Sequence, residues 1–274
     1  MRLLLAITFA VFGQLQAAAA EVSPRLQQLF QAIELTETVA VMREEGLSYG
    51  ESLRDDLFPG QGGEAWTQEV ARIYDGAWML EQVYIGMAKS LADAKVEDIT
   101  AYFDHGLGQR IVALEIEARR ELADKRVEEN SQDLYRDMVL EQEPRIDLLE
   151  RFVSANDLVE ANVVGAMNSN FAFYKGLARG NAAGFDLSEG EMLEDIWGQE
   201  QDIRNETSDW IYGYLVLAYA PLEDAELEDY VAFSRTAAGR SINKALFEAF
   251  DVMFVEISHK LGLAAARYMS GNDI

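Results

Sequence analysis

The amino-acid sequence predicts an all-α protein made of two related helical units that pack together. Apolar residues recur every three or four positions through most of the chain, which is the spacing of amphipathic helices. No segment alternates apolar and polar residues as a half-buried strand does. A stretch near residue 100 recurs, in altered form, near residue 230. Together these three observations indicate helices only, arranged as an internal repeat.

The repeated stretch begins at Leu91 and again at Leu222, and its two copies align over 21 positions without a gap. Eight of the 21 positions are identical, at a constant offset of 131 residues (239 − 108). Each copy is predicted to hold an acidic N-cap, an aromatic residue, and a glycine that opens the next helix, all with structural roles. These residues are Asp93, Tyr102 and Gly108 in the first copy, and Asp224, Phe233 and Gly239 in the second.

This arrangement of an acidic helix start, an aromatic residue and a glycine resembles the exported bacterial domain-of-unknown-function family 2059. Members of that family typically carry a Phe-Tyr pair, a Ser-Pro-like turn and a Gly at this place. The second copy is the closer match, although Ser234 stands where a Tyr is usual. The first copy has Asp104, His105 and Gly106 in place of the turn. The resemblance implies an α-helical exported protein with two tandem copies of the motif, and it brings no assigned activity.

The first 20 residues have the pattern of a secretory signal peptide. Arg2 precedes an apolar run, and four alanines end at Ala20, where small residues favour cleavage. We expect cleavage after Ala19 or Ala20, with an uncleaved N-terminal anchor as the alternative. The chain has no cysteine, so it forms no disulfide and offers no thiol for a lipid. We therefore expect a soluble periplasmic or secreted protein.

Two prolines divide the remaining chain into a first unit over residues 21–143 and a second unit over 144–274. Ser23 and Pro24 have the pattern of a helix start, with Ser as N-cap and Pro at the first helical position. Pro144 occupies a similar place further along the chain. We expect the boundary between the two units near this second proline.

Other features extend the repeat beyond its best-matched stretch. Trp66 and Trp197 are separated by the same 131 residues (197 − 66), so we expect them to be equivalent core residues. The Gly-rich segment 175–190 is predicted to hold the extra residues of the second copy. Residues 109–143 are predicted to form one long charged helix between the units, or two helices with a break near residue 130.

Each unit is expected to need the other for its core. A charged helical chain of roughly a hundred residues buries too little apolar surface alone, so we expect one globule with pseudo-twofold symmetry. A ligand site would then lie between the units or beside segment 175–190. The helices that follow the two repeat glycines carry apolar stripes that we expect to face inward. These stripes are Ile111, Leu114 and Ala118, and Ile242, Leu246 and Ala249.

Acidic residues dominate the composition, with 48 Asp and Glu against 23 Lys and Arg and a net charge of −25 at pH 7. Such a charge repels nucleic acid and anionic membrane surfaces, so neither is expected as a partner. No stretch after the signal peptide reaches the roughly 18 apolar residues of a membrane span. We therefore expect no membrane insertion after signal removal, and the composition leaves the oligomeric state open.

Few residues have the spacing of a catalytic or metal site. Glu256 and His259 form a Glu-x-x-His pair, which di-iron helix bundles use twice. There is no second such pair, so a structural pair near a helix end is the favoured interpretation, and no metal or other cofactor is expected. The chain also lacks a Gly-x-Ser-x-Gly elbow and a cysteine nucleophile. No residue is therefore predicted to be catalytic.

The sequence favours a non-enzymatic binding or interaction module of the cell envelope, with an envelope protein or a small molecule as its partner. The alternative is a hydrolase or a carboxylate-based metalloprotein whose site the sequence does not reveal. A concave pocket with clustered, desolvated carboxylates would favour the enzyme. A continuous exposed apolar groove would favour a module that binds another protein.

Overall fold

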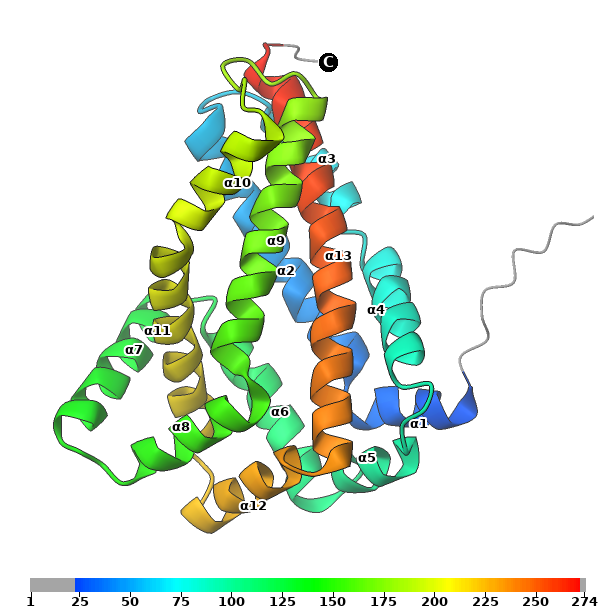
Figure 1. Cartoon of the computed structure of the whole chain (residues 1–274), viewed down its shortest axis with the longest axis vertical. Coiled ribbons are helices and arrows are strands. Elements are labelled where there is room, and N and C mark those ends of the chain that lie inside the picture. The colour runs from blue at the N-terminus through cyan, green and yellow to red at the C-terminus, as the bar shows by residue number, and fades with distance from the viewer. Residues whose placement is uncertain (1–22, 272–274) are drawn as a thin grey trace, which may run out of the picture.

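The computed structural model describes residues 23–271, and every regular element in that range is an α-helix (Figure 1). The predicted all-α class is therefore confirmed. The predicted signal peptide over residues 1–20 and its cleavage site lie outside the described residues. In chain order the helices are α1 (Pro24–Ala32), α2 (Leu35–Leu57), α3 (Gly63–Ile73), α4 (Gly76–Ser90), α5 (Val96–Phe103), α6 (Gly106–Glu121), α7 (Lys125–Leu140), α8 (Arg145–Asn156), α9 (Leu158–Arg179), α10 (Glu189–Gly198), α11 (Glu200–Tyr219), α12 (Asp224–Ser234) and α13 (Ala237–Met269).

The helices before and after α7 follow the same order of neighbours. Helix α1 packs against α5, and α8 packs against α12 in the same way. Helix α2 contacts α3 and α4, as α9 contacts α10 and α11. The last helix of each set crosses to the other set, because α6 packs against α11 and α13 packs against α4. Figure 1 shows the result: α9 and α13 stand side by side at the centre, between α11 and α4.

Because α6 and α13 each cross to the other set of helices, the molecule has two hydrophobic cores that both sets share. The first lies among α1 to α5 and includes Met253 and Ile257 of α13. The second lies among α8, α11 and α12 and includes Ile111 and Ala118 of α6. Each core is therefore completed by a helix from the other part of the chain.

The two predicted apolar stripes both face inward, as expected. Ile111 and Ala118 of α6 are buried, and so are Ile242 and Ala249 of α13. The middle residue of each stripe is half-buried against one of the cores. Helical spacing therefore located the inner faces of both helices correctly.

Gly108 and Gly239 lie at the same point of two turns of equal length. A Cβ at Gly108 would overlap the carbonyl oxygen of Tyr102, and a Cβ at Gly239 would overlap that of Phe233. Glycine therefore lets the end of the preceding helix approach the next one closely in both turns. The turns differ in their caps, because Thr236 Oγ1 accepts a hydrogen bond from Gly239 N at 3.0 Å and His105 makes no such bond.

Asp93 is not the N-cap of α5, contrary to the prediction. The backbone N–H of Ala94 donates to the carbonyl oxygen of Leu91 at 3.0 Å and closes a turn that contains Asp93. The helix begins only after this turn, and Lys95 occupies the cap position.

Asp224 is not an N-cap either. It is the first residue of α12, and Glu223 precedes it as the cap residue. The backbone N–H of Glu223 donates to the carboxylate of Glu226 at 2.9 Å. The carboxylate of Asp224 pairs with Arg145 instead, so it ties α12 to α8.

The two aromatic residues of the repeat stack on each other. The ring centroids of Tyr102 and Phe233 are 3.7 Å apart, and their planes make an angle of 6°. The two residues that the repeat offset pairs (233 − 102 = 131) are therefore in direct contact. The stack also joins α5 to α12, so it holds the two units together at this end of the molecule.

The predicted equivalence of Trp66 and Trp197 as core residues is wrong. Trp66 is 0% exposed, and its Nε1 donates to the carbonyl oxygen of Gly50 at 2.7 Å. Trp197 is 66% exposed. Helix α10 turns Met192 and Ile196 inward instead, and Trp197 follows Ile196 on a face that the helix leaves open.

The chain over residues 109–143 forms two helices rather than one. Helix α6 ends at Glu121, and the carboxylate of Asp124 caps α7 by accepting a hydrogen bond from Arg126 N at 2.9 Å. Helix α7 then continues without a break through residue 130. The non-helical segment 180–188 between α9 and α10 is four residues longer (9 − 5) than segment 58–62 between α2 and α3, so it does not hold all of the predicted extra residues of the second copy.

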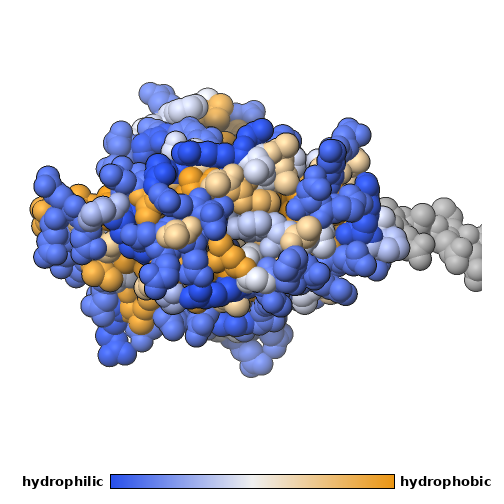
Figure 2. Space-filling model, turned by 90° about the horizontal axis from the view of Figure 1, so that it is seen from below, coloured by the Kyte–Doolittle hydropathy of each residue, from blue (hydrophilic) through white to orange (hydrophobic). Residues whose placement is uncertain are grey.

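The outer surface is mainly polar. Seen from below, hydrophilic side chains cover most of the molecule, and hydrophobic ones show between them (Figure 2). Apolar atoms normally make up a large part of the surface of a folded protein. Within residues 23–271, no helix combines the length and the apolar character that crossing a bilayer requires.

Candidate functional site

A cavity of about 780 Å³ lies between the two units, at the end of the molecule where the two repeat turns meet. Its walls come from α2, α5 and α6 of the first unit and from α8, α9, α11, α12 and α13 of the second. Pockets for small molecules typically have volumes of roughly 300–1,000 Å³. The position between the units is one of the two places expected for a ligand site.

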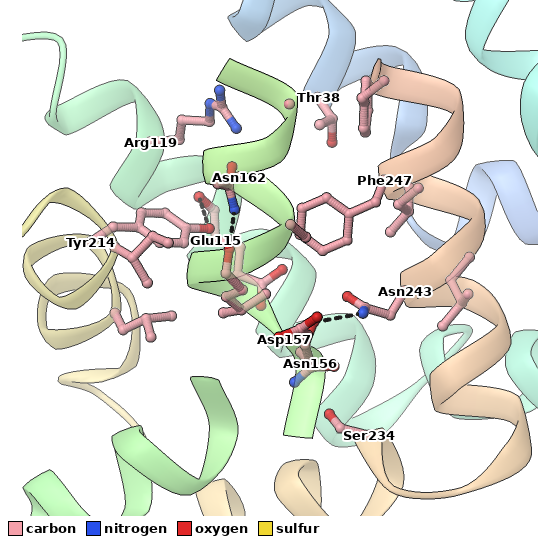
Figure 3. A pocket seen from close by; sticks show the side chains of 18 of the residues that line it. Thr38, Glu115, Arg119, Asn156, Asp157, Asn162, Tyr214, Ser234, Asn243 and Phe247 are labelled. Carbon is pink, nitrogen blue, oxygen red and sulfur yellow. Dashed lines mark hydrogen bonds between the residues drawn. The ribbon is translucent and has the colours of Figure 1, made fainter. Parts of the chain in front are cut away.

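Helices α9 and α13 lie close together near their C-terminal ends and further apart toward their N-terminal ends, on the side of the cavity (Figure 1). Near their C-terminal ends, Gly176 and Gly262 leave no room for a Cβ, because each packs against the backbone of the other helix. Toward its N-terminal end, α13 carries Phe247, Phe250 and Phe254, which line the cavity. Figure 3 shows Phe247 pointing from α13 into the space between the helices. Small residues at one end and aromatic residues at the other therefore hold the two helices in a V.

Glu115 of α6 places a carboxyl group in the cavity wall. Its Oε1 accepts hydrogen bonds from Tyr219 Oη at 2.6 Å and from Tyr230 Oη at 3.2 Å. Tyr214 Oη donates to the backbone carbonyl oxygen of Glu115 at 3.2 Å. The three tyrosines belong to α11 and α12, whereas Glu115 belongs to the first unit. The carboxyl group is therefore held in place by hydroxyl groups from the second unit.

The environment of Glu115 changes its acidity. Burial raises the pKa of Glu115 to about 7, because the charged form loses its hydration among apolar and aromatic side chains. The hydrogen bonds from Tyr219 and Tyr230 oppose this rise, because they favour the charged carboxylate. Burial has the larger effect. The carboxyl group of Glu115 therefore changes its charge near neutral pH, which is typical of functional sites.

Arg119 lies one turn after Glu115 and is already engaged. Its Nε and Nη2 donate to the two carboxylate oxygens of Glu45 on α2, at 2.7 and 2.9 Å. Its guanidinium carbon lies 5.8 Å from the ring centroid of Trp210, which stacks on Tyr214. A bidentate ion pair with a carboxylate is the strongest hydrogen-bonded arrangement that an arginine makes. Arg119 therefore fixes α6 to α2 and does not neutralise Glu115.

The rim of the cavity is formed by α9 and α13 and is polar. Asn162 Nδ2 donates to the carbonyl oxygen of Leu158 at 2.7 Å, and Asn243 Nδ2 donates to that of Asn156 at 2.9 Å (Figure 3). The amide side chains therefore bond to backbone near the junction of α8 and α9. Four further acidic residues line the cavity at its rim: Asp157, Glu160, Glu248 and Asp251.

The predicted metal-ligand pair does not gather further ligands. Glu256 pairs with Lys260 at 2.8 Å. His259 Nδ1 lies 3.3 Å from the carbonyl oxygen of Ala172, on the side of α13 that faces α9. No group of three or more His, Cys, Asp or Glu side chains in the described part of the chain has metal-binding geometry.

The repeat residues divide between structure and cavity. Phe233 and Gly239 line the cavity. The remaining repeat residues lie outside its lining: Asp93, Tyr102, Gly108 and Asp224.

Glu115 was missed by the sequence reasoning, although a signal for it exists. The offset of the repeat places Glu115 opposite Leu246 (115 + 131 = 246), and both residues line the cavity. Glu115 also lies beside Ile111 and Ala118 on the inward face of its helix. A carboxylate at an inward position where the other copy has leucine is the pattern that identifies it.

Comparisons of the chain with protein-family models, with curated proteins and with solved structures gave no significant match. The function is therefore argued from the cavity and its lining.

Proposed function

We propose that this chain is an exported, non-enzymatic binding protein that holds a small, largely apolar molecule in the cavity between its two units. The cavity carries the proposal. Its volume of about 780 Å³ suits a small molecule, and aliphatic and aromatic side chains make up most of its wall. Export to the periplasm rests on the signal-peptide pattern of residues 1–20 and on the family resemblance. A concave site of this size favours a small molecule over an envelope protein as the partner.

The two units are also proposed to derive from one duplicated unit. The recurring order of helix neighbours supports this, as do the shared close contact at Gly108 and Gly239 and the stacking of Tyr102 on Phe233. The different caps of the two turns and the different burial of Trp66 and its counterpart mark where the copies have diverged. A binding site at the junction of two copies is a natural consequence of such a history.

Binding is tested with N-phenyl-1-naphthylamine, an uncharged apolar dye whose fluorescence rises in apolar surroundings. We expect saturable binding of one dye molecule per mature chain. Ala161 lines the cavity, so Ala161→Trp should fill part of it and weaken binding by roughly tenfold or more, through overpacking of the occupied space.

The matched control is Ala113→Trp, which places the same side chain on the exposed face of α6. This variant should bind the dye as the wild type does. Thermal melting followed by circular dichroism shows whether both variants are folded. A folded Ala161→Trp protein that binds the dye as tightly as the wild type, or a wild type that does not bind it, would contradict the proposal.

A hydrolase is the second candidate, and Glu115 is the observation that favours it. A carboxyl group with a pKa of about 7 can exchange protons efficiently near neutral pH. Among the residues described, the cavity offers no serine, threonine or cysteine that is hydrogen-bonded to an activating base. Turnover of 4-nitrophenyl esters or glycosides by the wild type, lost in Glu115→Gln, would favour the hydrolase. Dye binding without such turnover favours the binding protein.

A further inference from the structure

We propose that the molecule bound in the cavity is a cationic amphiphile, in which an ammonium group faces Glu115 and an apolar body lies among the aromatic rings. This inference rests on the proposed binding function and specifies its ligand. Three features of the cavity carry it: the charges of its wall, the free oxygen of Glu115, and the aromatic lining.

The charged groups of the cavity wall are almost all acidic. Five carboxylates line the cavity, and the sole lining cation within residues 23–271 is Arg119, whose guanidinium is held by Glu45. Two of the five carboxylates have cationic partners, because Glu160 pairs with Arg204 and Glu248 pairs with Lys244. The described residues place no cation within ion-pair distance of the other three: Glu115, Asp157 and Asp251.

Glu115 offers one oxygen to a ligand. Both tyrosine hydroxyl groups, of Tyr219 and Tyr230, donate to Oε1. Oε2 accepts no hydrogen bond from residues 23–271, and the half-buried side chain to which it belongs lines the cavity. A carboxylate oxygen in such a position is best satisfied by a charged donor. An ammonium group provides both the hydrogen bond and the opposite charge.

The aromatic lining suits the same ligand. Rings of Tyr214, Tyr219, Tyr230 and Phe233 lie in the wall around Glu115, and Trp210 lies beside Tyr214. The faces of such rings attract cations and also pack against apolar chains. An anionic amphiphile such as a fatty acid would face five carboxylates and one engaged arginine. A neutral amphiphile would leave Oε2 without a strong donor.

The acidity of Glu115 adds a dependence on pH. A bound cation stabilises the ionised carboxylate, so binding should be strongest above the pKa of about 7 and weaken below it. The tyrosines around Glu115 do not titrate in this range, because burial raises each pKa further above 10. The titratable or charged groups that surround Glu115 from neighbouring elements are Tyr102 on α5, Arg119 on α6 with Glu45 on α2, Tyr214 and Tyr219 on α11, and Tyr230 on α12.

The test uses three probes with the same ten-carbon chain: decylammonium, 1-decanol and decanoate. Isothermal titration calorimetry at about pH 8, below micelle-forming concentrations, should give the tightest binding for decylammonium, by roughly tenfold to a hundredfold over decanol. Decanoate should bind most weakly. The affinity for decylammonium should fall when the pH is lowered to about 6, and the affinity for decanol should not change.

Two variants separate the role of Glu115 from a general charge effect. Glu115→Gln should reduce the affinity for decylammonium to that for decanol. Glu117→Gln removes the same charge from the exposed face of α6 and should leave all three affinities unchanged. If Glu115→Gln does not fold, the ranking of the three probes on the wild type still decides the question.

The outcomes distinguish this inference from the proposed function. If none of the probes and no apolar dye binds, the binding function itself is wrong. If decanol or decanoate binds as tightly as decylammonium, the cavity binds apolar molecules and the inference about charge is overturned. It is also overturned if folded Glu115→Gln binds decylammonium as the wild type does.

Discussion

The two turns built around Gly108 and Gly239 are alike, but the helices that follow them are not. Helix α13 continues without interruption from Ala237 to Met269, packs on both α4 and α9, and completes the first core. Helix α6 stops at Glu121, and the chain folds back as α7 against α11. The same local turn therefore leads to a long spanning helix in one unit and to two short helices in the other.

The cavity lies where the two units differ. On α13 the wall carries Leu246 and three phenylalanines, and on α6 the position that corresponds to Leu246 carries Glu115. At this pair of positions, α13 therefore presents an apolar side chain to the cavity and α6 presents a carboxyl group. The shared turn therefore positions the two helices, whereas the positions that differ between α6 and α13 decide which chemical groups face the cavity.

The largest effect is expected from the tryptophans that the repeat offset pairs. Trp66→Ala should lower the free energy of unfolding by about 3–5 kcal/mol, because it empties a fully buried site and removes the hydrogen bond to Gly50. Trp197→Ala should change it by about 0.5 kcal/mol or less, because the side chain is mostly exposed. Urea unfolding of both variants measures the difference. Equal losses would show that Trp197 is also a core residue.

A smaller effect is expected when Glu115 is made neutral. The folded state raises the pKa of Glu115 from 4.5 to about 7, so the folded protein binds the proton more tightly than the unfolded chain. The favourable contribution is complete below about pH 4.5 and is lost as the pH rises through about 7, which amounts to about 3 kcal/mol. Glu115→Gln has no titrating group at this position, so its free energy of unfolding does not fall in this way as the pH rises.

The measurement is the difference in unfolding free energy between Glu115→Gln and the wild type, followed from about pH 4 to pH 8. The free energy of unfolding of the variant, relative to that of the wild type, should rise steadily as the pH increases across this range. Glu117→Gln on the exposed face of the same helix should show no such trend. A flat difference for Glu115→Gln would mean that its carboxyl group is hydrated in the folded protein.

The smallest effect, and the most direct test of the likeness, concerns the two glycines. Gly108→Ala and Gly239→Ala should each cost about 1–3 kcal/mol of stability, because the new Cβ would meet a backbone carbonyl oxygen in both turns. Gly190→Ala is the control, since nothing lies near its Cβ position and alanine favours the helix. Thermal unfolding of the three variants gives the comparison. Tolerance of alanine at only one repeat glycine would show that the two turns are not equivalent.

Much of the fold was predictable because helices have a strong periodic signal. The inward positions of Ile111, Ala118, Ile242 and Ala249 follow from apolar spacing alone. The same offset wrongly predicted that Trp197 is buried, because one identical residue carries no information about which face of α10 is buried. Tertiary packing, rather than residue identity, decides that face.

The details of caps and the cavity were not predictable in the same way. Asp93 has the right chemistry for an N-cap, but a turn closed by backbone atoms shifts the start of α5 past it. Glu115 has the spacing of an ordinary inward residue, and its importance depends on three tyrosines more than 98 positions away in the chain. Local sequence patterns do not predict contacts between residues so far apart in the chain.

Helix α13 comes late in the chain but completes the first core, and this affects the order in which the molecule can fold. The core among α1 to α5 is open until α13, the last of the described helices, is in place. Contacts between segments so distant in the chain form slowly, because a long loop must close before they stabilise anything. A chain synthesised from its N-terminus therefore cannot finish its first core until α13 has left the ribosome. If the chain is exported unfolded, as proposed, this delay keeps it in the state that transport requires.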